Sequence, residues 1–323
     1  MRAIHHAADR LNGWLVARRQ QAPIASDLAD LEELSTLAER DPRALLRPVE
    51  SAAIAFDPEE GARSKVETFA FSSPAPFGDS ANDRVHGERW LAADRPSKSA
   101  IVMLHGGFAP SWLAERLMAH PFLAKRIDVF VIALPWHMDR APSSSGYSGQ
   151  YLLSGDVPRL VRGFSQGAHD AAALVLALRQ QGYRRVFVSG ISLGGNIAAQ
   201  TASLAVLDGV FLLIPAIDPF QTIFRSPIGA GMARAASNAG FDDREIERAM
   251  RLVTPHFAGL PKSDPDAFRV VHGTYDLFCS AEAIEEFVQA WSITQVQSLK
   301  VGHRTFAINF RQTARLLAHD AGT

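Results

Sequence analysis

Apolar residues gather in short continuous runs along much of the chain, and longer amphipathic stretches separate these runs. Runs that are apolar nearly throughout are typical of strands buried on both faces of a sheet. The five clearest are IVMLH (101–105), DVFVIAL (128–134), RVFVSGI (185–191), GVFLLI (209–214) and FRVVHG (268–273). The stretches that separate them have the length of crossover helices, which parallel strands require: 111–126, 165–181, 194–206 and 280–291. The pattern predicts an α/β fold, a mostly parallel sheet with helices on both faces.

Weaker patterns lie at both ends of this core. VETFAF (66–71) and RVHGERWLA (84–92) are typical of opening antiparallel strands. QSLKV (297–301) predicts a last strand, followed by a closing helix at 305–318. We therefore expect the sheet domain to span residues 66–320.

The first part of the chain has a different texture. Residues 5–20 and 27–46 carry apolar positions at helical spacing, which predicts a helical N-terminal extension over 1–65. Trp14, Leu15 and the arginines that follow them could lie on a membrane surface, but we expect this extension to dock onto the main body.

A second irregularity lies between the strand at 209–214 and the strand at 268–273. Residues 217–262 replace a single crossover helix with mixed helix-like and Pro/Gly-containing sequence, which we interpret as a cap over the carboxyl edge of the sheet. Its apolar residues, Phe220 and Phe224 among them, are candidates for substrate binding. Docking of the cap onto the body is an equally good explanation for them.

Composition narrows the range of functions. The 323 residues carry a net charge of -1, so no global charge favours nucleic acid or an acidic membrane. A single cysteine allows no intrachain disulfide, and cysteine clusters that might hold a metal are lacking. No stretch is apolar for long enough to span a bilayer, and the first residues do not resemble a secretory signal. We expect a cytoplasmic protein without stable membrane insertion; the oligomeric state stays open.

The most specific motif is Gly190-Ile191-Ser192-Leu193-Gly194, at the junction of an expected strand and an expected helix. A serine hydroxyl is a poor nucleophile, and a sharp strand-to-helix turn exposes it to a base. This context predicts Ser192 as the nucleophile of a hydrolase. A glycine-rich turn without catalytic function is the simpler alternative.

A second glycine pair, in His105-Gly106-Gly107-Phe108, ends the first long apolar run. Such a loop can direct backbone N–H groups at a developing oxyanion, so we expect the N–H groups of Gly107 and Leu193 to form an oxyanion hole. In this interpretation His105 shapes the loop, and Phe108 contacts the substrate.

Among eleven histidines, position favours His303 as the base. It follows the last expected strand and so returns to the edge that carries Ser192, whereas His5 and His6 are expected to be remote from that edge. The orienting acid should lie between serine and histidine. Asp276 follows the penultimate strand and is our first choice; Asp218, one strand earlier, is the main rival.

The order Ser192, Asp276, His303, with His-Gly-Gly upstream, resembles the α/β-hydrolase superfamily over roughly residues 66–320. More narrowly, two stretches resemble the branch called abhydrolase domain-containing protein eighteen: SWLAERLMAHPFLAKRIDVFVIALPWHMDR (111–140) and GYRRVFVSGISLGGNIAAQTA (182–202). The superfamily resemblance implies a sheet of about eight strands, an acyl-enzyme mechanism, and no cofactor or metal.

Together these features predict a serine hydrolase that cleaves an ester-like acyl bond, most simply a carboxylesterase acting on an apolar small molecule. A peptidase, thioesterase or acyltransferase could use the same three residues, because the fold does not define the leaving group. A binding protein that keeps the fold without catalysis is the alternative from another class.

Overall fold

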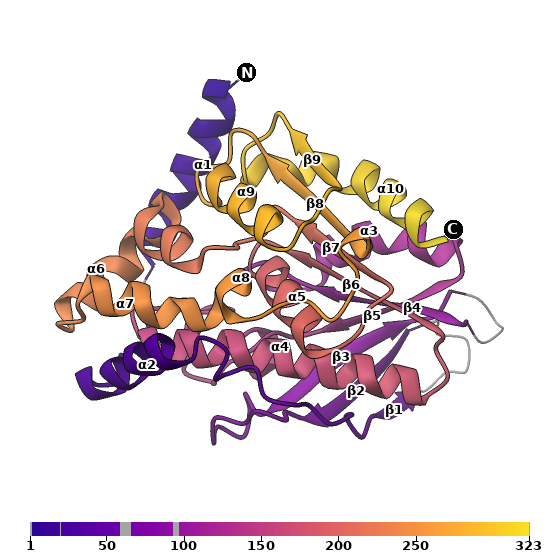
Figure 1. The fold of residues 1–323 in the computed structure, drawn as a ribbon, viewed down its shortest axis with the longest axis horizontal. Helices are drawn as coiled ribbons and strands as arrows, with labels where there is room; N and C mark the ends of the chain where they lie inside the picture. Colours follow the sequence, from indigo (N-terminus) through magenta and orange to yellow (C-terminus); the bar gives the residue numbers. More distant parts are fainter. Residues whose placement is uncertain (1, 20, 59–65, 93–96, 323) are drawn as a thin grey trace.

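The computed structural model describes residues 2–19, 21–58, 66–92 and 97–322. In these ranges nine strands form one sheet in the order β1-β2-β3-β5-β4-β6-β7-β8-β9 (Figure 1). The strands are β1 (Ala55–Pro58), β2 (Val66–Ser72), β3 (Arg84–Trp90), β4 (Ser99–Leu104), β5 (Ile127–Ile132), β6 (Arg185–Ile191), β7 (Gly209–Leu213), β8 (Phe268–Gly273) and β9 (Val296–Leu299). Pairing is antiparallel from β1 through β3 to β5 and parallel for all remaining neighbours, which confirms the predicted α/β architecture.

Strand β1 was not expected. It pairs with β2, with Ala55 opposite Ala70, so the sheet begins inside the segment that the sequence assigned to a helical extension. Four residues are too few to show an alternation of apolar and polar positions, and for that reason the sequence pattern missed this strand.

Helices cover both faces of the sheet. Along β4, the side chains of Ala100, Val102 and Leu104 pack in the core cluster that includes residues of α4 and α5, while Ile101 and Met103 pack with α3 and α10. Because both faces are covered, every residue of β4 and β5 is buried. The helices that cover the two faces are α3 (Leu113–Ala124), α4 (Val157–Gln180), α5 (Leu193–Leu204), α9 (Ala281–Ala290) and α10 (Phe310–Gly322). Helix α4 starts earlier than the sequence pattern indicated, because Asp156 caps its first turn through the N–H of Arg159.

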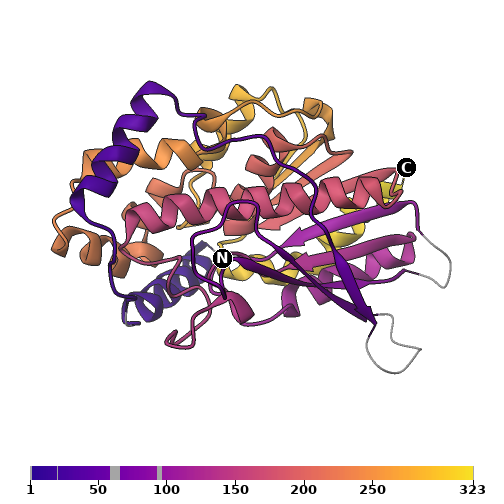
Figure 2. The same ribbon diagram turned by 90° about the horizontal axis from the view of Figure 1, so that it is seen from below.

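Residues 217–262 lie between β7 and β8 and fold into short helical segments. They are η2 (Gln221–Arg225), η3 (Pro227–Gly229), α6 (Ala230–Asn238), α7 (Asp243–Met250), η4 (Arg251–Val253) and α8 (Pro255–Ala258). The N-terminal helices α1 (Arg2–Ala17) and α2 (Leu28–Arg40) lie on the side of the molecule that these segments occupy, as Figures 1 and 2 show. Helix α2 packs against α7, and α1 packs against η3 and α6. None of the helices in the described ranges is both long and apolar enough to cross a membrane.

Candidate active site

Ser192 occupies the sharp turn between β6 and α5. Its backbone has φ 54° and ψ -110°, a conformation that a residue other than glycine rarely adopts and that projects the side chain away from the sheet. The turn depends on small neighbours. A Cβ on Gly190 would lie 2.0 Å from the carbonyl oxygen of Gly194, and a Cβ on Gly194 would lie 2.2 Å from that of Leu104. The glycines of the motif are therefore required by the close backbone packing around Ser192.

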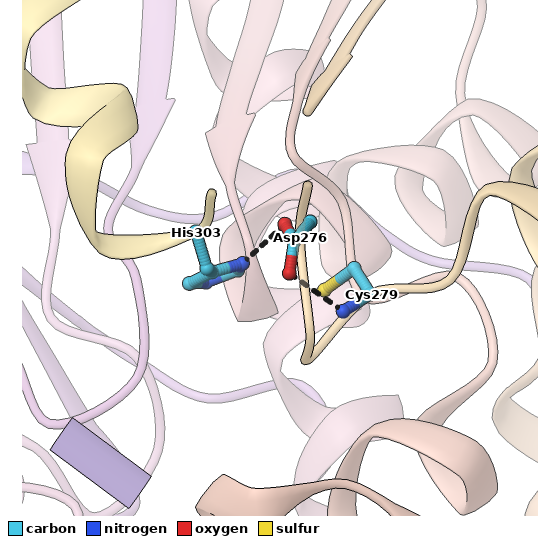
Figure 3. A group of neighbouring side chains, drawn as sticks. All are labelled: Asp276, Cys279 and His303. Carbon is cyan, nitrogen blue, oxygen red and sulfur yellow. Dashed lines mark hydrogen bonds and ion pairs between the residues drawn. The ribbon is translucent and has the colours of Figure 1, made fainter. Parts of the chain in front are cut away.

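Three side chains meet in a chain of hydrogen bonds at this turn. His303 Nε2 lies 3.0 Å from Ser192 Oγ, and His303 Nδ1 lies 2.7 Å from Asp276 Oδ2. The other oxygen of Asp276 accepts the N–H group of Cys279 (3.0 Å; Figure 3). It also accepts the N–H group of Phe278 (2.8 Å), so two bonds fix the carboxylate. An ionised carboxylate can only accept, so Nδ1 carries the proton and Nε2 is free to accept the serine hydroxyl.

Strand topology explains how residues so far apart in sequence come together. Ser192 follows β6, Asp276 lies three residues past β8, and His303 lies four residues past β9. These strands are parallel, so their carboxyl ends lie at one edge of the sheet. The structure thus brings together the three residues that the sequence selected.

The electrostatics of His303 are dominated by two opposing effects. Burial is the largest single influence and lowers the pKa of this imidazole, but Asp276 and, after it, Cys279 together outweigh burial and raise the pKa well above 6.5. The ring of Phe278 lies against it, with ring centroids 5.0 Å apart. The result is a base held in one orientation, which gains stability when it becomes an imidazolium.

Cys279 lies beside this pair, and its thiol, together with Asp276 and His303, offers three donor atoms within 4.8 Å of one another (Figure 3). Such a set could in principle hold a metal ion. However, burial raises the pKa of the Cys279 thiol, so the thiol is neutral near pH 7 and a weak ligand. Hydrogen bonds already engage His303 Nδ1 and both oxygens of Asp276. The arrangement fits proton transfer better than metal binding.

The glycine loop after β4 lies next to Ser192. The N–H of Phe108 donates to His137 Nε2 (3.2 Å), so it is not available to an oxyanion. By contrast, the N–H groups of Gly107 and Leu193 have no partner among the described residues, and a Cβ on Gly107 would lie 4.0 Å from that of Leu193. Two unpaired donors, one on the glycine loop and one at the start of α5, are what the predicted oxyanion hole requires.

His105 is buried beneath this loop. Its Nε2 accepts the N–H of Leu134 (3.0 Å), and its Nδ1 lies 2.8 Å from the carbonyl oxygen of Gly106. Burial lowers the pKa of His105 to about 4, so the ring is neutral at physiological pH. These contacts fit a residue that supports the loop.

The structure separates the rival acid from His303, and it places two histidines differently from the sequence-based expectation. Asp218, the rival acid, accepts the N–H of Gln221 and makes no hydrogen bond to His303. His5 and His6, expected far from the site, both pack against the ring of Tyr275, which directly precedes Asp276. No sequence pattern could have shown this, because the contact depends on where helix α1 docks.

The phenylalanines proposed to bind substrate have different environments. Phe220 and Phe224 are each 5% exposed, stack on each other and belong to the main core, so they dock the segment rather than face a ligand. The prediction that they contact substrate does not fit this burial. Phe108, in contrast, is only partly buried and lies on the loop beside Ser192. The apolar residues that include the neighbours of Asp276 form a small cluster that the sequence did not single out: Ala216, Ile228, Leu277, Phe278 and Cys279. Of these, only Ile228 and Leu277 are partly exposed.

A mostly parallel sheet of this order, with a serine on the turn after β6, defines an α/β-hydrolase architecture. The chain belongs to the alpha/beta hydrolase family, whose model matches residues 101–312. No curated protein matches the sequence, and the narrower resemblance to abhydrolase domain-containing protein eighteen is not supported.

Solved structures of esterases share the fold. Acetyl xylan esterase 1 from Thermoanaerobacterium sp. JW/SL YS485 superposes with a TM-score of 0.58 at 16% identity, covering 94% of this chain and 98% of its own. An acetyl xylan esterase from Paenibacillus sp. R4 gives 0.56 at 13% identity, covering 90% and 96%. Brefeldin A esterase, a bacterial homologue of human hormone-sensitive lipase, gives 0.51 at 18% identity, covering 98% and 92%. At these identities the likeness concerns the fold.

Proposed function

We propose that this chain is a serine esterase that hydrolyses a small, uncharged carboxylic ester through an acyl-enzyme intermediate. The observation that carries the proposal is the hydrogen-bond chain from Ser192 Oγ through His303 to Asp276. A serine, an imidazole and a carboxylate in this order are what nucleophilic acyl transfer needs, and a purely structural role would not require it.

In the proposed reaction, His303 Nε2 accepts the hydroxyl proton as Ser192 Oγ attacks the ester carbonyl carbon. The tetrahedral intermediate places its negative oxygen at the N–H groups of Gly107 and Leu193. The C–O bond to the alcohol then breaks, and His303 gives its proton to the leaving oxygen. Water, deprotonated by His303, then attacks the acyl carbon. His303 gives this proton to Ser192 Oγ as the acyl C–Oγ bond breaks and the acid is released.

The nature of the substrate follows from what lines the site. The partly buried side chains at the site include two apolar ones, Phe108 on the loop beside Ser192 and Ile228 in the cluster that contains Phe278, so an apolar acyl or alcohol group fits better than a charged one. The cytoplasmic location stays a prediction from the sequence.

The test is labelling with a fluorophosphonate probe, which reacts only with an activated serine. We expect one adduct, on Ser192, and none in Ser192→Ala. Ser189→Ala is a matched control, because Ser189 is buried on β6, the strand that leads to Ser192, and its loss should leave labelling intact. Hydrolysis of p-nitrophenyl esters of increasing chain length then defines the acyl group. Absence of labelling in the folded wild type would contradict the proposal.

A further inference from the structure

Helix α1 reaches the active site through one buried carboxylate. Asp9 has no exposed surface, and its two oxygens accept three backbone N–H groups. Oδ2 accepts from His303 (3.0 Å) and Leu277 (3.2 Å), and Oδ1 accepts from Arg304 (2.9 Å). One side chain therefore joins the loop that carries His303 to the loop that carries Asp276.

The surrounding residues are adapted to this contact. A Cβ on Gly302 would lie 2.8 Å from Asp9 Oδ2, so only glycine allows the carboxylate to approach the backbone here. One turn earlier in α1, His5 Nδ1 lies 2.7 Å from Thr305 Oγ1, and its ring stacks on Tyr275. Helix α1 thus contacts both loops along two turns.

These bonds bear on catalysis because the loops are irregular backbone. Between β9 and η6 (Arg304–Asn309), His303 is not held by a sheet or helix ladder, and its own N–H is bonded to Asp9. Hydrogen bonds to an ionised carboxylate are stronger than neutral ones. A displacement of about 1 Å at a reacting group can cost about 100-fold in rate. Two such bonds hold the backbone of the His303 loop, at His303 and Arg304, and the third holds the Asp276 loop at Leu277.

We propose that Asp9 is a positioning residue, which holds the His303 and Asp276 loops in register from the N-terminal helix. The proposal rests on the proposed esterase function for its kinetic consequence, but the positioning can be measured without a substrate. Asp9→Asn keeps the size of the side chain and turns one acceptor into an NH2 donor that faces a backbone N–H. At least one of the three bonds is then lost.

The matched control is Asp128→Asn. Asp128 is also buried and accepts a backbone N–H, from Ala92 (2.9 Å), and the hydroxyl of Tyr183 (2.7 Å). It lies near the start of β5, at the edge of the sheet opposite to Ser192. Both variants should lower the melting temperature, so stability alone does not separate a positioning role from a structural one.

Two readouts make that separation. We expect Asp9→Asn to lower kcat by about 100-fold with little change in KM, and Asp128→Asn to leave both unchanged. In proton NMR of the free proteins, the far-downfield resonance of the His303 Nδ1–H should shift or broaden in Asp9→Asn only. If Asp9→Asn does not fold, Gly302→Ala tests the same contact with Asp9 intact and should have the same effect.

The outcomes are distinct. An unchanged resonance and unchanged kcat in folded Asp9→Asn would overturn the positioning role. If the wild type hydrolyses no ester but the His303 Nδ1–H resonance differs between the wild type and Asp9→Asn, the positioning role stands and the proposed esterase function fails.

The opposite face of α1 carries an independent feature. Four large apolar side chains are half or more exposed on this helix: Ile4, Leu11, Trp14 and Leu15. The exposed charged residues of the helix, Arg2 and Arg10, are both arginines, because its one acid, Asp9, is buried; Arg18 follows directly after the helix and is also exposed. Next to its end, Arg234 donates to the carbonyl oxygen of Ala17. An apolar stripe bordered by cations is typical of a helix that lies on an anionic membrane surface.

We infer that this face of α1 binds anionic lipid and brings the neighbouring site to the membrane surface. Co-sedimentation with vesicles of phosphatidylglycerol and phosphatidylcholine should retain the protein, while vesicles of phosphatidylcholine alone should not. Leu11→Ser combined with Leu15→Ser should abolish binding; Leu260→Ser, at another exposed leucine, should not. Equal binding to both vesicles would contradict the inference, as would a dimer in solution that the double variant dissociates.

Discussion

The Asp276 carboxylate offers the sharpest test of the active site, through the isosteric change Asp276→Asn. In the structure Oδ1 accepts two backbone N–H groups, from Phe278 and Cys279, so an asparagine places its carbonyl oxygen on that side. Its NH2 group then faces His303 Nδ1, at the position of the present 2.7 Å bond. Two N–H donors cannot form a hydrogen bond with each other, so Nδ1 must become the acceptor and the proton of His303 must move to Nε2.

The consequence can be estimated. With the proton on Nε2, His303 can no longer accept the hydroxyl proton of Ser192 across the 3.0 Å contact. The equivalent change in a serine protease triad lowers turnover by about 10⁴-fold, equivalent to about 5 kcal/mol in the activation barrier. Binding of the ester does not use this proton, so KM should change little.

The assay compares the rates of p-nitrophenyl ester hydrolysis and of fluorophosphonate labelling for the wild type, Asp276→Asn and Asp218→Asn. Asp218 serves as the control, because its carboxylate accepts the N–H of Gln221 and asparagine can do the same. We expect the loss only in Asp276→Asn. Near-normal activity of Asp276→Asn together with loss in Asp218→Asn would refute the assignment of Asp276 as the acid.

Three further predictions concern pH, stability and the cap. Because Asp276 raises the pKa of His303, kcat/KM should fall as pH decreases, with a midpoint above 6.5, and a kinetic midpoint at or below 6.5 would contradict the raised pKa. The stability that the imidazolium contributes to the fold is present below pH 6.5 and is lost as pH rises through the raised pKa. Glu115 is 2% exposed, neither carboxylate oxygen has a partner among the described residues, and burial raises its pKa to about 7. The wild type should therefore lose stability as pH rises from 4.5 to 7, because the buried carboxyl ionises, whereas Glu115→Gln should not. In urea unfolding, the free energy of unfolding of Glu115→Gln should rise relative to the wild type by about 3 kcal/mol over that range, and a difference that does not depend on pH would argue against ionisation of Glu115. Phe224→Ala should destabilise the protein by about 3–5 kcal/mol with KM unchanged, as for a core residue, and a raised KM at unchanged stability would return Phe224 to the substrate site.

Much of the site could be predicted from the sequence, because its residues follow strand ends. Continuous apolar runs identified β4 through β8, and parallel strands end at one edge, so Ser192, Asp276 and His303 could be placed together by order alone. The importance of the glycines around Ser192 and of those after His105 could also be predicted from the sequence. Where one backbone segment lies in contact with another there is no room for a Cβ, so only glycine fits, and the glycine is visible in the sequence.

The choice between Asp276 and Asp218 needed the tertiary structure. Both follow a strand that ends at the correct edge, and only the direction of each loop decides which carboxylate reaches His303. The same holds for Phe220 and Phe224, since an apolar residue in an insertion can face either the core or the ligand with the same pattern.

The role of Asp9 is the clearest case of a feature that the sequence alone did not determine. An aspartate in an amphipathic helix is an ordinary polar residue, and nothing in its neighbours distinguishes it from a solvated one. Its partners in the His303 loop are backbone N–H groups almost three hundred positions away. Since every residue except proline has a backbone N–H, the residue types at those positions do not indicate the contact. The sequence determined which residues can do the chemistry, whereas the docking of α1 determined what holds them in place.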